Sequence, residues 1–211
     1  MSVTPALLIA GLIAALPYAI HHINGPVGLS RTVTKTIPLI CLTLFAAFTS
    51  APPLIIAALA FSTIGDAALS RDGDRWFVTG LIAFLLAHVA FIALFWPLFD
   101  VAHLTGGRNP LWLLFACAPA WGCILLYRLW GRLGALRFPT MLYAVVIAAM
   151  TMLATGLGRP FASATIGAVL FAVSDSLLAI EKFGSKQSPA IAQLIWWPYI
   201  IGQSLILAAF I

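Results

Sequence analysis

The sequence has few charged residues, and this scarcity excludes several classes of protein. Only 8% of its 211 residues are Asp, Glu, Lys or Arg, whereas soluble domains carry about 25%. Apolar side chains make up 63% of the chain, and the mean hydropathy is +1.08. This composition excludes an ordinary soluble globule, a disordered chain and a disulfide scaffold. It indicates that lipid is the solvent for most of the chain.

Cysteines and catalytic signature motifs are also scarce. The three cysteines, Cys41, Cys117 and Cys123, lie in or beside apolar runs, so we expect them to act as small hydrophobic residues without disulfide or zinc pairing. The sequence contains no HExxH, P-loop, GxGxxG or GxSxG motif. We therefore expect neither a metal ion nor a cofactor.

Long apolar runs are abundant and fill most of the chain. Most of them approach the roughly 20 residues that a helix needs to cross about 30 Å of hydrocarbon. They lie near residues 3–20, 36–51, 52–69, 76–97, 110–127, 138–156, 160–181 and 190–211. Pro52-Pro53 predicts a tight turn between the second and third runs. We expect one all-α membrane domain over residues 1–211 with eight transmembrane helices, the first run being a retained helix rather than a signal peptide.

Basic residues are distributed unevenly among the loops. The first, third, fifth and seventh loops contain Arg31, Lys35, Arg71, Arg75, Arg128, Arg132, Arg137, Lys182 and Lys186, whereas the other loops contain only Arg108 and Arg159. This bias predicts cytoplasmic odd-numbered loops and extracytoplasmic termini. The net charge of +5 is scattered and forms no basic block, so we expect no nucleic-acid partner.

The third and seventh runs contain similar short motifs. The segments 61–69 and 171–179 each place a small residue before an aspartate, Asp66 or Asp175, and a leucine three positions after it. Four helices separate the two runs, so they would cross the membrane in the same direction. This similarity raises the possibility of a parallel four-plus-four repeat.

The aspartates Asp66 and Asp175 are the strongest functional candidates. An ionisable group at membrane depth costs several kcal/mol unless it is paired or hydrated, so it marks a functional site by default. Both aspartates are expected in the cytoplasmic half of the membrane. The alternative is that each caps a helix or pairs locally near the interface.

Further polar residues are expected near the two aspartates. As substrate-binding or orienting residues we single out Lys35, Ser62, His88, Tyr143, Ser174, Tyr199 and Gln203. Their ordinary alternatives are packing for the histidine, a helix-end position for the lysine and an interfacial belt for the tyrosines. Trp196 and Trp197 are predicted to be lipid-facing or interfacial anchors. The common depth of the polar residues predicts a pocket that opens toward the cytoplasmic leaflet.

Several of these motifs together resemble the YhhN family. The resemblance rests on F-S-x-x-G-D-x-x-L at 61–69, G-A-x-L-F-x-x-S-D-x-x-L-A at 167–179 with the trailing Phe183, Lys35-Thr36-Ile37-Pro38, His88 after Gly80 and Phe84, and Tyr199 with Gln203. It covers nearly the whole chain. Phe91 departs from the pattern, since many relatives are expected to have tyrosine there.

The resemblance implies a lysoplasmalogenase-like activity. Such an enzyme cleaves the vinyl ether of lysoplasmenyl-ethanolamine or -choline into a fatty aldehyde and glycerophospho-ethanolamine or -choline. Asp66 and Asp175 would form the acid/base pair, one protonated and the other ionised, and Lys35 would bind the lipid phosphate, with Arg71 or Arg75 as substitutes. The implied partners are a lysophospholipid and the bilayer, and the implied location is a bacterial inner membrane.

Two other functions remain open at this point. A proton-coupled transporter of a small molecule or lipid would also use intramembrane Asp and His residues. A non-catalytic lipid-binding protein would bind lysolipid without forming product. The sequence leaves open which aspartate is the acid, the head-group preference and the oligomeric state.

Overall fold

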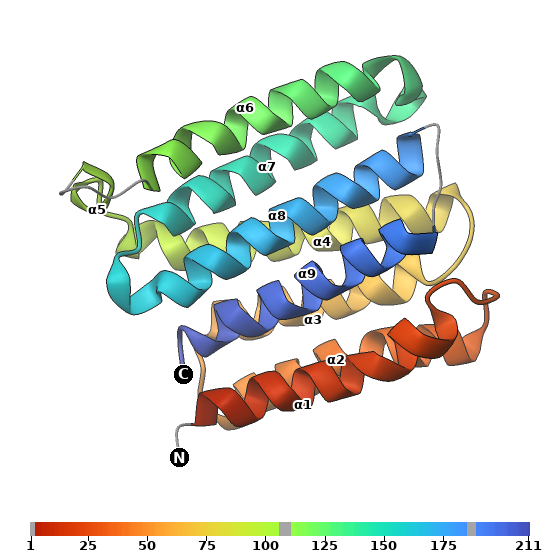
Figure 1. The fold of residues 1–211 in the computed structure, drawn as a ribbon, viewed down its shortest axis with the longest axis horizontal. Helices are drawn as coiled ribbons and strands as arrows, with labels where there is room; N and C mark the ends of the chain where they lie inside the picture. The colour runs from red at the N-terminus through yellow and green to blue at the C-terminus, as the bar shows by residue number, and fades with distance from the viewer. Residues whose placement is uncertain (1–2, 106–110, 185–188) are drawn as a thin grey trace.

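The chain forms a bundle of long helices packed side by side (Figure 1). The computed structural model describes residues 3–105, 111–184 and 189–211, and these residues form helices and connecting turns without any strand. The long helices of this part of the chain are α1 (Val3–Pro17), α2 (Leu29–Phe48), α3 (Pro53–Leu69), α4 (Asp74–Phe95), α6 (Leu111–Leu129), α7 (Arg137–Thr155), α8 (Ala162–Phe183) and α9 (Pro189–Ala208). A short α5 (Ala102–Thr105) follows α4. Each predicted apolar run corresponds to one long helix, and both termini lie at the same end of the bundle (Figure 1).

Within the described residues, six helices are long and apolar enough to cross a membrane: α2, α4, α6, α7, α8 and α9. Helix α3 and the apolar segment Ile9–His22 are shorter. Large apolar side chains cover the outside of the bundle, for example Ile13 at 60% exposure and Phe48 at 86%. Such an extensive apolar surface would cause association in water, and it fits a multi-pass protein surrounded by lipid.

Helix boundaries confirm one prediction and correct another. Helix α2 ends at Phe48 and α3 begins at Pro53, so the proline pair does separate two helices. Helix α2 begins at Leu29, however, and Lys35 lies well inside it rather than at its start. The first residues of this helix are mostly polar, so the apolar run in the sequence begins later than the helix itself. Arg108 and Lys186, used in the loop-charge argument, lie outside the described residues.

Helices α8 and α9 approach each other closely at two glycines. A Cβ atom on Gly167 would lie 2.5 Å from the Gly202 carbonyl oxygen, and one on Gly202 would lie 2.7 Å from the Gly167 carbonyl oxygen. Small residues allow membrane helices to pack at short range. This contact fixes α9 against α8, and thereby places the polar residues of both helices.

We expect Gly167→Ala to destabilise the protein by about 1–3 kcal/mol, because the new methyl group must push two backbones apart. Gly122→Ala is the matched control, since its Cβ would meet nothing closer than 3.9 Å. Thermal unfolding in detergent measures both variants. Equal unfolding midpoints for the two variants would contradict the close-contact explanation.

The N-terminal helix packs against α9 through buried polar contacts. The Trp196 indole is only 3% exposed and donates a hydrogen bond of 3.3 Å to the Ala15 carbonyl oxygen. Gln193 donates one of 2.7 Å to the Ala19 carbonyl oxygen. The predicted lipid-facing position of Trp196 is therefore wrong, because its N–H group and ring are used between helices. Trp197 is partly buried and packs against the core.

Candidate functional site

A polar pocket of about 440 Å³ opens at the end of the bundle opposite the termini. Its walls come from α2, α3, α4, α8, α9 and the turns beside them. Both candidate aspartates line this pocket, as do Lys35, Ser174 and Tyr199. Residues from separate helices therefore meet at one site.

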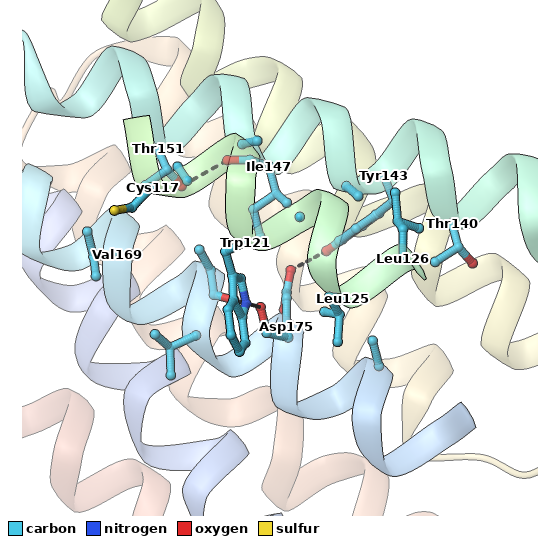
Figure 2. Close-up of a pocket in the computed structure, with 18 of the residues that line it drawn as sticks. Cys117, Trp121, Leu125, Leu126, Thr140, Tyr143, Ile147, Thr151, Val169 and Asp175 are labelled. Carbon is cyan, nitrogen blue, oxygen red and sulfur yellow. Dashed lines mark hydrogen bonds between the residues drawn. The ribbon is translucent and has the colours of Figure 1, made fainter. Parts of the chain in front are cut away.

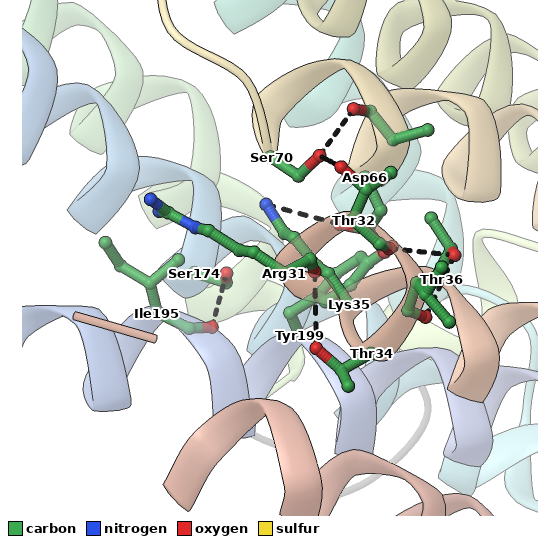
Figure 3. A network of polar contacts seen from close by, with 12 residues as sticks. Arg31, Thr32, Thr34, Lys35, Thr36, Asp66, Ser70, Ser174, Ile195 and Tyr199 are labelled. Carbon is green, nitrogen blue, oxygen red and sulfur yellow. Dashed lines mark hydrogen bonds and ion pairs between the residues drawn. The ribbon is translucent and has the colours of Figure 1, made fainter. Parts of the chain in front are cut away.

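Asp66 lies deep in the pocket wall and has two polar partners on other helices. Its carboxylate is 2% exposed, and the Lys35 Nζ atom lies 3.7 Å from its Oδ1 atom. The Tyr199 hydroxyl donates a 2.7 Å hydrogen bond to its Oδ2 atom. Figure 3 shows this group at the junction of α2, α3 and α9. A buried carboxylate is therefore compensated by a cation on one oxygen and a hydroxyl on the other.

The position of Lys35 follows from the polar half of α2. Arg31 lies one turn earlier and donates to the Gly25 carbonyl oxygen at 3.2 Å, while the Thr32 hydroxyl lies 2.6 Å from that of Ser70 (Figure 3). These bonds tie the start of α2 to the loop before it and to the end of α3. Lys35 consequently projects into the pocket, with its Nζ atom 5.8 Å from the centre of the Tyr18 ring.

Asp175 has a corresponding set of partners. The Tyr143 hydroxyl donates a hydrogen bond to the Asp175 Oδ2 atom (Figure 2), and the His88 Nε2 atom lies 3.6 Å from the same oxygen. The other ring nitrogen of His88, Nδ1, lies 2.6 Å from the Phe84 carbonyl oxygen. A carbonyl oxygen can only accept, so Nδ1 carries a hydrogen and Nε2 faces the carboxyl group.

Aromatic rings fill the space between the two groups. Phe171 packs against His88 at a centroid distance of 4.6 Å and against Tyr199 at 5.3 Å. Phe84 contacts both Phe171 and Tyr199. The rings leave little room for bulk water beneath the carboxyl groups, and a low-polarity surrounding strengthens the polar contacts that remain.

Three of the predicted site residues have structural partners instead. The Gln203 amide donates a 2.8 Å hydrogen bond to the Ser62 hydroxyl, and neither side chain lines the polar pocket. The Ser174 hydroxyl donates one of 2.8 Å to the Ile195 carbonyl oxygen. These bonds hold α9 against α3 and α8, although Ser174 also contributes to the pocket wall.

The rim of the polar pocket contains charges of both signs. Arg31, Arg71 and Lys182 contribute positive charge, and Asp72 and Glu181 contribute negative charge. Arg71 also stacks on Trp76, with its guanidinium carbon 4.5 Å from the ring centre. Of the two arginines proposed as substitutes for Lys35, only Arg71 lines the pocket; Arg75 does not.

Arg31 was not predicted as a site residue, although the sequence contains a signal for it. It precedes Lys35 by four positions, and residues with this spacing share a helix face. The apolar run begins only near residue 36, so the sequence predicted that Arg31 lies in the loop before the helix. Glu181, near the end of α8, is partly exposed and also lines the pocket.

Metal ligands are not clustered in the described residues. Over 3–105, 111–184 and 189–211, no group of three or more His, Cys, Asp or Glu side chains is arranged to hold an ion. The three cysteines are free and exposed on the outside of the bundle. The site geometry thus consists of two carboxyl groups with hydroxyl, imidazole and ammonium partners.

A second, apolar crevice reaches Asp175 from the opposite side. It has a volume of about 450 Å³ and is lined by α6, α7 and α8 (Figure 2). Trp121 of α6 donates a 3.0 Å hydrogen bond to the Ser176 hydroxyl of α8 across this crevice. Asp175 therefore lies at the boundary between a polar and an apolar compartment.

Comparisons with known proteins agree with the motifs. The YhhN family model matches residues 30–210. Two curated proteins named lysoplasmalogenase, from Mycobacterium bovis and Mycobacterium tuberculosis, are each 36% identical to this chain over 159 residues. The aligned region covers 74% of this chain and 59% of each relative, so the match spans less than two thirds of the relatives' length. No solved structure matches the chain.

Proposed function

This chain belongs to the YhhN family, and from that premise we propose that it hydrolyses the vinyl ether bond of a lysoplasmalogen. The substrate would be lysoplasmenyl-ethanolamine or -choline, and the products would be a fatty aldehyde and glycerophospho-ethanolamine or -choline. The names of the two mycobacterial relatives and the residues of the polar pocket support this function.

One observation carries the proposal. Asp66 and Asp175, on separate helices, line one polar pocket, and each accepts a hydrogen bond from a tyrosine of another helix. Paired carboxyl groups in a site shielded from water are suited to acid/base catalysis through a cationic intermediate. Glycosidases use the same principle for their oxocarbenium-like transition states.

The reaction needs one proton donor, one water molecule and a stabiliser of positive charge. A carboxyl group donates its proton to the β-carbon of the vinyl ether, and the electrons of the double bond form the new C–H bond. The adjacent carbon becomes an oxocarbenium ion, which a nearby carboxylate stabilises. Water adds to this carbon and gives a proton back to the carboxyl group that donated one. The resulting hemiacetal then breaks the C–O bond to the glyceryl oxygen, and its hydroxyl proton passes to that oxygen, which gives aldehyde and alcohol.

Five neighbouring residues assist in three different ways within this scheme. Tyr199 and Tyr143 hold the two carboxyl groups in place through the hydrogen bonds described above. Lys35 and Arg31 supply positive charge inside the polar pocket for the lipid phosphate. The His88 Nε2 atom faces the same Asp175 oxygen that accepts from Tyr143, at 3.6 Å.

The proposal includes a membrane topology. All eight long helices would span the membrane as one domain over residues 1–211, with both termini outside the cytoplasm and the polar pocket facing it. The basic residues of the odd-numbered loops support this orientation, and the expected location is a bacterial inner membrane. Eight spans also agree with both termini lying at one end of the bundle.

The proposed four-plus-four repeat gains support from the partners of the aspartates. Helices α3 and α8 occupy equivalent places in the repeat and each carries an aspartate. Asp66 lies beside Lys35 of α2, and Asp175 lies beside Tyr143 of the equivalent helix α7. Tyr199 of α9 and His88 of the equivalent α4 complete the two sets. A duplicated half would place both sets in the same layer of the membrane.

Aldehyde release tests the proposed function. We expect the purified protein in detergent to release fatty aldehyde from lysoplasmenyl-ethanolamine and none from the matching alkyl ether, which lacks the double bond to be protonated. The measurement is mass spectrometry of both products. If no aldehyde forms while solute accumulates unchanged in proteoliposomes, the protein is a carrier and the proposal is wrong.

A further inference from the structure

The crevice between α6 and α8 continues beyond the region shown in Figure 2. A neighbouring cavity of about 680 Å³ shares Leu114 of α6 and Val169 of α8 with it and extends to Ala162 at the start of α8. The stretch of α8 from Asp175 back to Ala162 is about 20 Å long at 1.5 Å per residue. The two cavities share these lining residues and lie in series along α8, from the Asp175 carboxyl group to a far end that His103 and Arg159 also line.

Helix α6 leaves this space accessible from the side of the bundle. Among the described side chains of α6, only Leu129 at its end is buried. Small residues contribute to each wall of the crevice between its larger apolar side chains, and they are Ala118, Gly122, Ala144, Ala148 and Ala172. A space of this shape suits one flexible hydrocarbon chain that arrives from the bilayer.

The neighbouring polar pocket has the charge pattern of a zwitterionic head group. Arg31 and Lys35 suit a phosphate, while Asp72 and Glu181 suit an ammonium group on the same ligand. A lysophospholipid has both parts, a charged head and a single chain. Asp175 is the titratable residue that lines both compartments.

We propose that the crevice between α6 and α8 binds the alkenyl chain of the lysolipid substrate, with the vinyl ether at Asp175 and the head group in the polar pocket. This inference rests on the proposed function and specifies where that substrate lies. It also selects the occupant: a single-chain lipid with a charged head, in place of a bilayer lipid with two chains.

This placement assigns different roles to the two aspartates. In a vinyl ether the β-carbon lies on the chain side and the oxygen on the head-group side. Asp175, at the mouth of the apolar crevice, is next to the β-carbon and donates the proton to it. Asp66, paired with Lys35, lies on the head-group side and faces the carbon that becomes cationic.

Chain length provides the first test. Ala148 lies on α7 beyond Tyr143, about 7.5 Å along the helix axis, and its side chain lines the crevice. We expect Ala148→Phe to lower kcat/KM for a hexadecenyl lysolipid by about 100-fold and to leave kcat/KM for a butenyl lysolipid unchanged. The matched control is Val145→Phe on the same helix, because Val145 is 60% exposed and does not line the crevice.

Photo-crosslinking provides a second test. It uses the wild-type protein, so its result depends neither on turnover nor on the folding of a variant. An alkyl ether lysolipid with a diazirine at the end of its chain is expected to label peptides of α6 and α8. Competition by excess lysolipid, but not by diacyl phospholipid, is expected to remove the label.

The outcomes separate the chain site from the reaction. If wild-type protein releases no aldehyde but the probe labels α6 and α8, the proposed function fails and the lipid site stands. If aldehyde forms but the label falls on other helices, the crevice assignment is wrong. Equal losses for both chain lengths in Ala148→Phe would also overturn it.

Discussion

Asp175→Asn is expected to lower kcat for aldehyde release by about 10³-fold, with little change in KM, because the amide cannot donate a proton to carbon. The asparagine side chain keeps the shape of aspartate, and its oxygen can still accept the hydrogen bond from Tyr143. The loss should therefore appear in the chemical step. Steady-state kinetics with lysoplasmenyl-ethanolamine measures this effect, and the unfolding midpoint in detergent shows whether the variant is folded.

Asp74→Asn is the matched control for this substitution. Asp74 is 92% exposed, lies outside the polar pocket and pairs with Lys182 at 3.8 Å, so turnover should stay at the wild-type value. Asp66→Asn should also reduce turnover, but with lower stability because Lys35 loses its partner. Full activity in a folded Asp175→Asn protein would remove this residue from the proposed mechanism.

Lys35→Met is expected to lower the free energy of unfolding by about 3 kcal/mol. The substitution removes the cation from a carboxylate that is 2% exposed, and a buried charge without its partner is strongly destabilising. The methionine side chain fills similar space, so the loss reports mainly on charge. Unfolding in detergent, followed by tryptophan fluorescence, measures it.

A double substitution separates the charge effect from lost packing. Adding Asp66→Asn to Lys35→Met removes the unpaired charge and should restore most of the lost stability. Lys182→Met serves as the surface control, because its partner Asp74 is almost fully exposed and the unfolding midpoint should hardly change. If Lys35→Met behaves like Lys182→Met, the ion pair with Asp66 contributes little to stability.

The helices themselves were predictable from the sequence. Apolar runs of membrane-spanning length and the Pro52-Pro53 pair are local signals, and each run corresponds to one long helix. The polar residues inside those runs stand out because lipid makes them costly. For this reason Asp66, Asp175 and their partners stand out in the sequence alone.

The pairing of these residues could not be predicted in the same way. Tyr199 and Asp66 are 133 positions apart, and Gln203 and Ser62 are 141 apart. A helix in a membrane is apolar on nearly all sides, so its sequence pattern does not reveal which face meets a neighbour. Trp196 is an example. A tryptophan in an apolar run suggested a lipid-facing or interfacial anchor, whereas packing places this side chain between α1 and α9.

The sequence by itself determined the fold class, the helix count and the candidate residues, because these follow from local hydrophobicity and from the cost of polar groups in lipid. Only the tertiary structure decided which partner each aspartate has, that Ser62 and Gln203 bond to each other, and that an apolar crevice ends at Asp175. Those features depend on the directions in which eight helices face one another, and close packing of side chains from distant segments sets these directions.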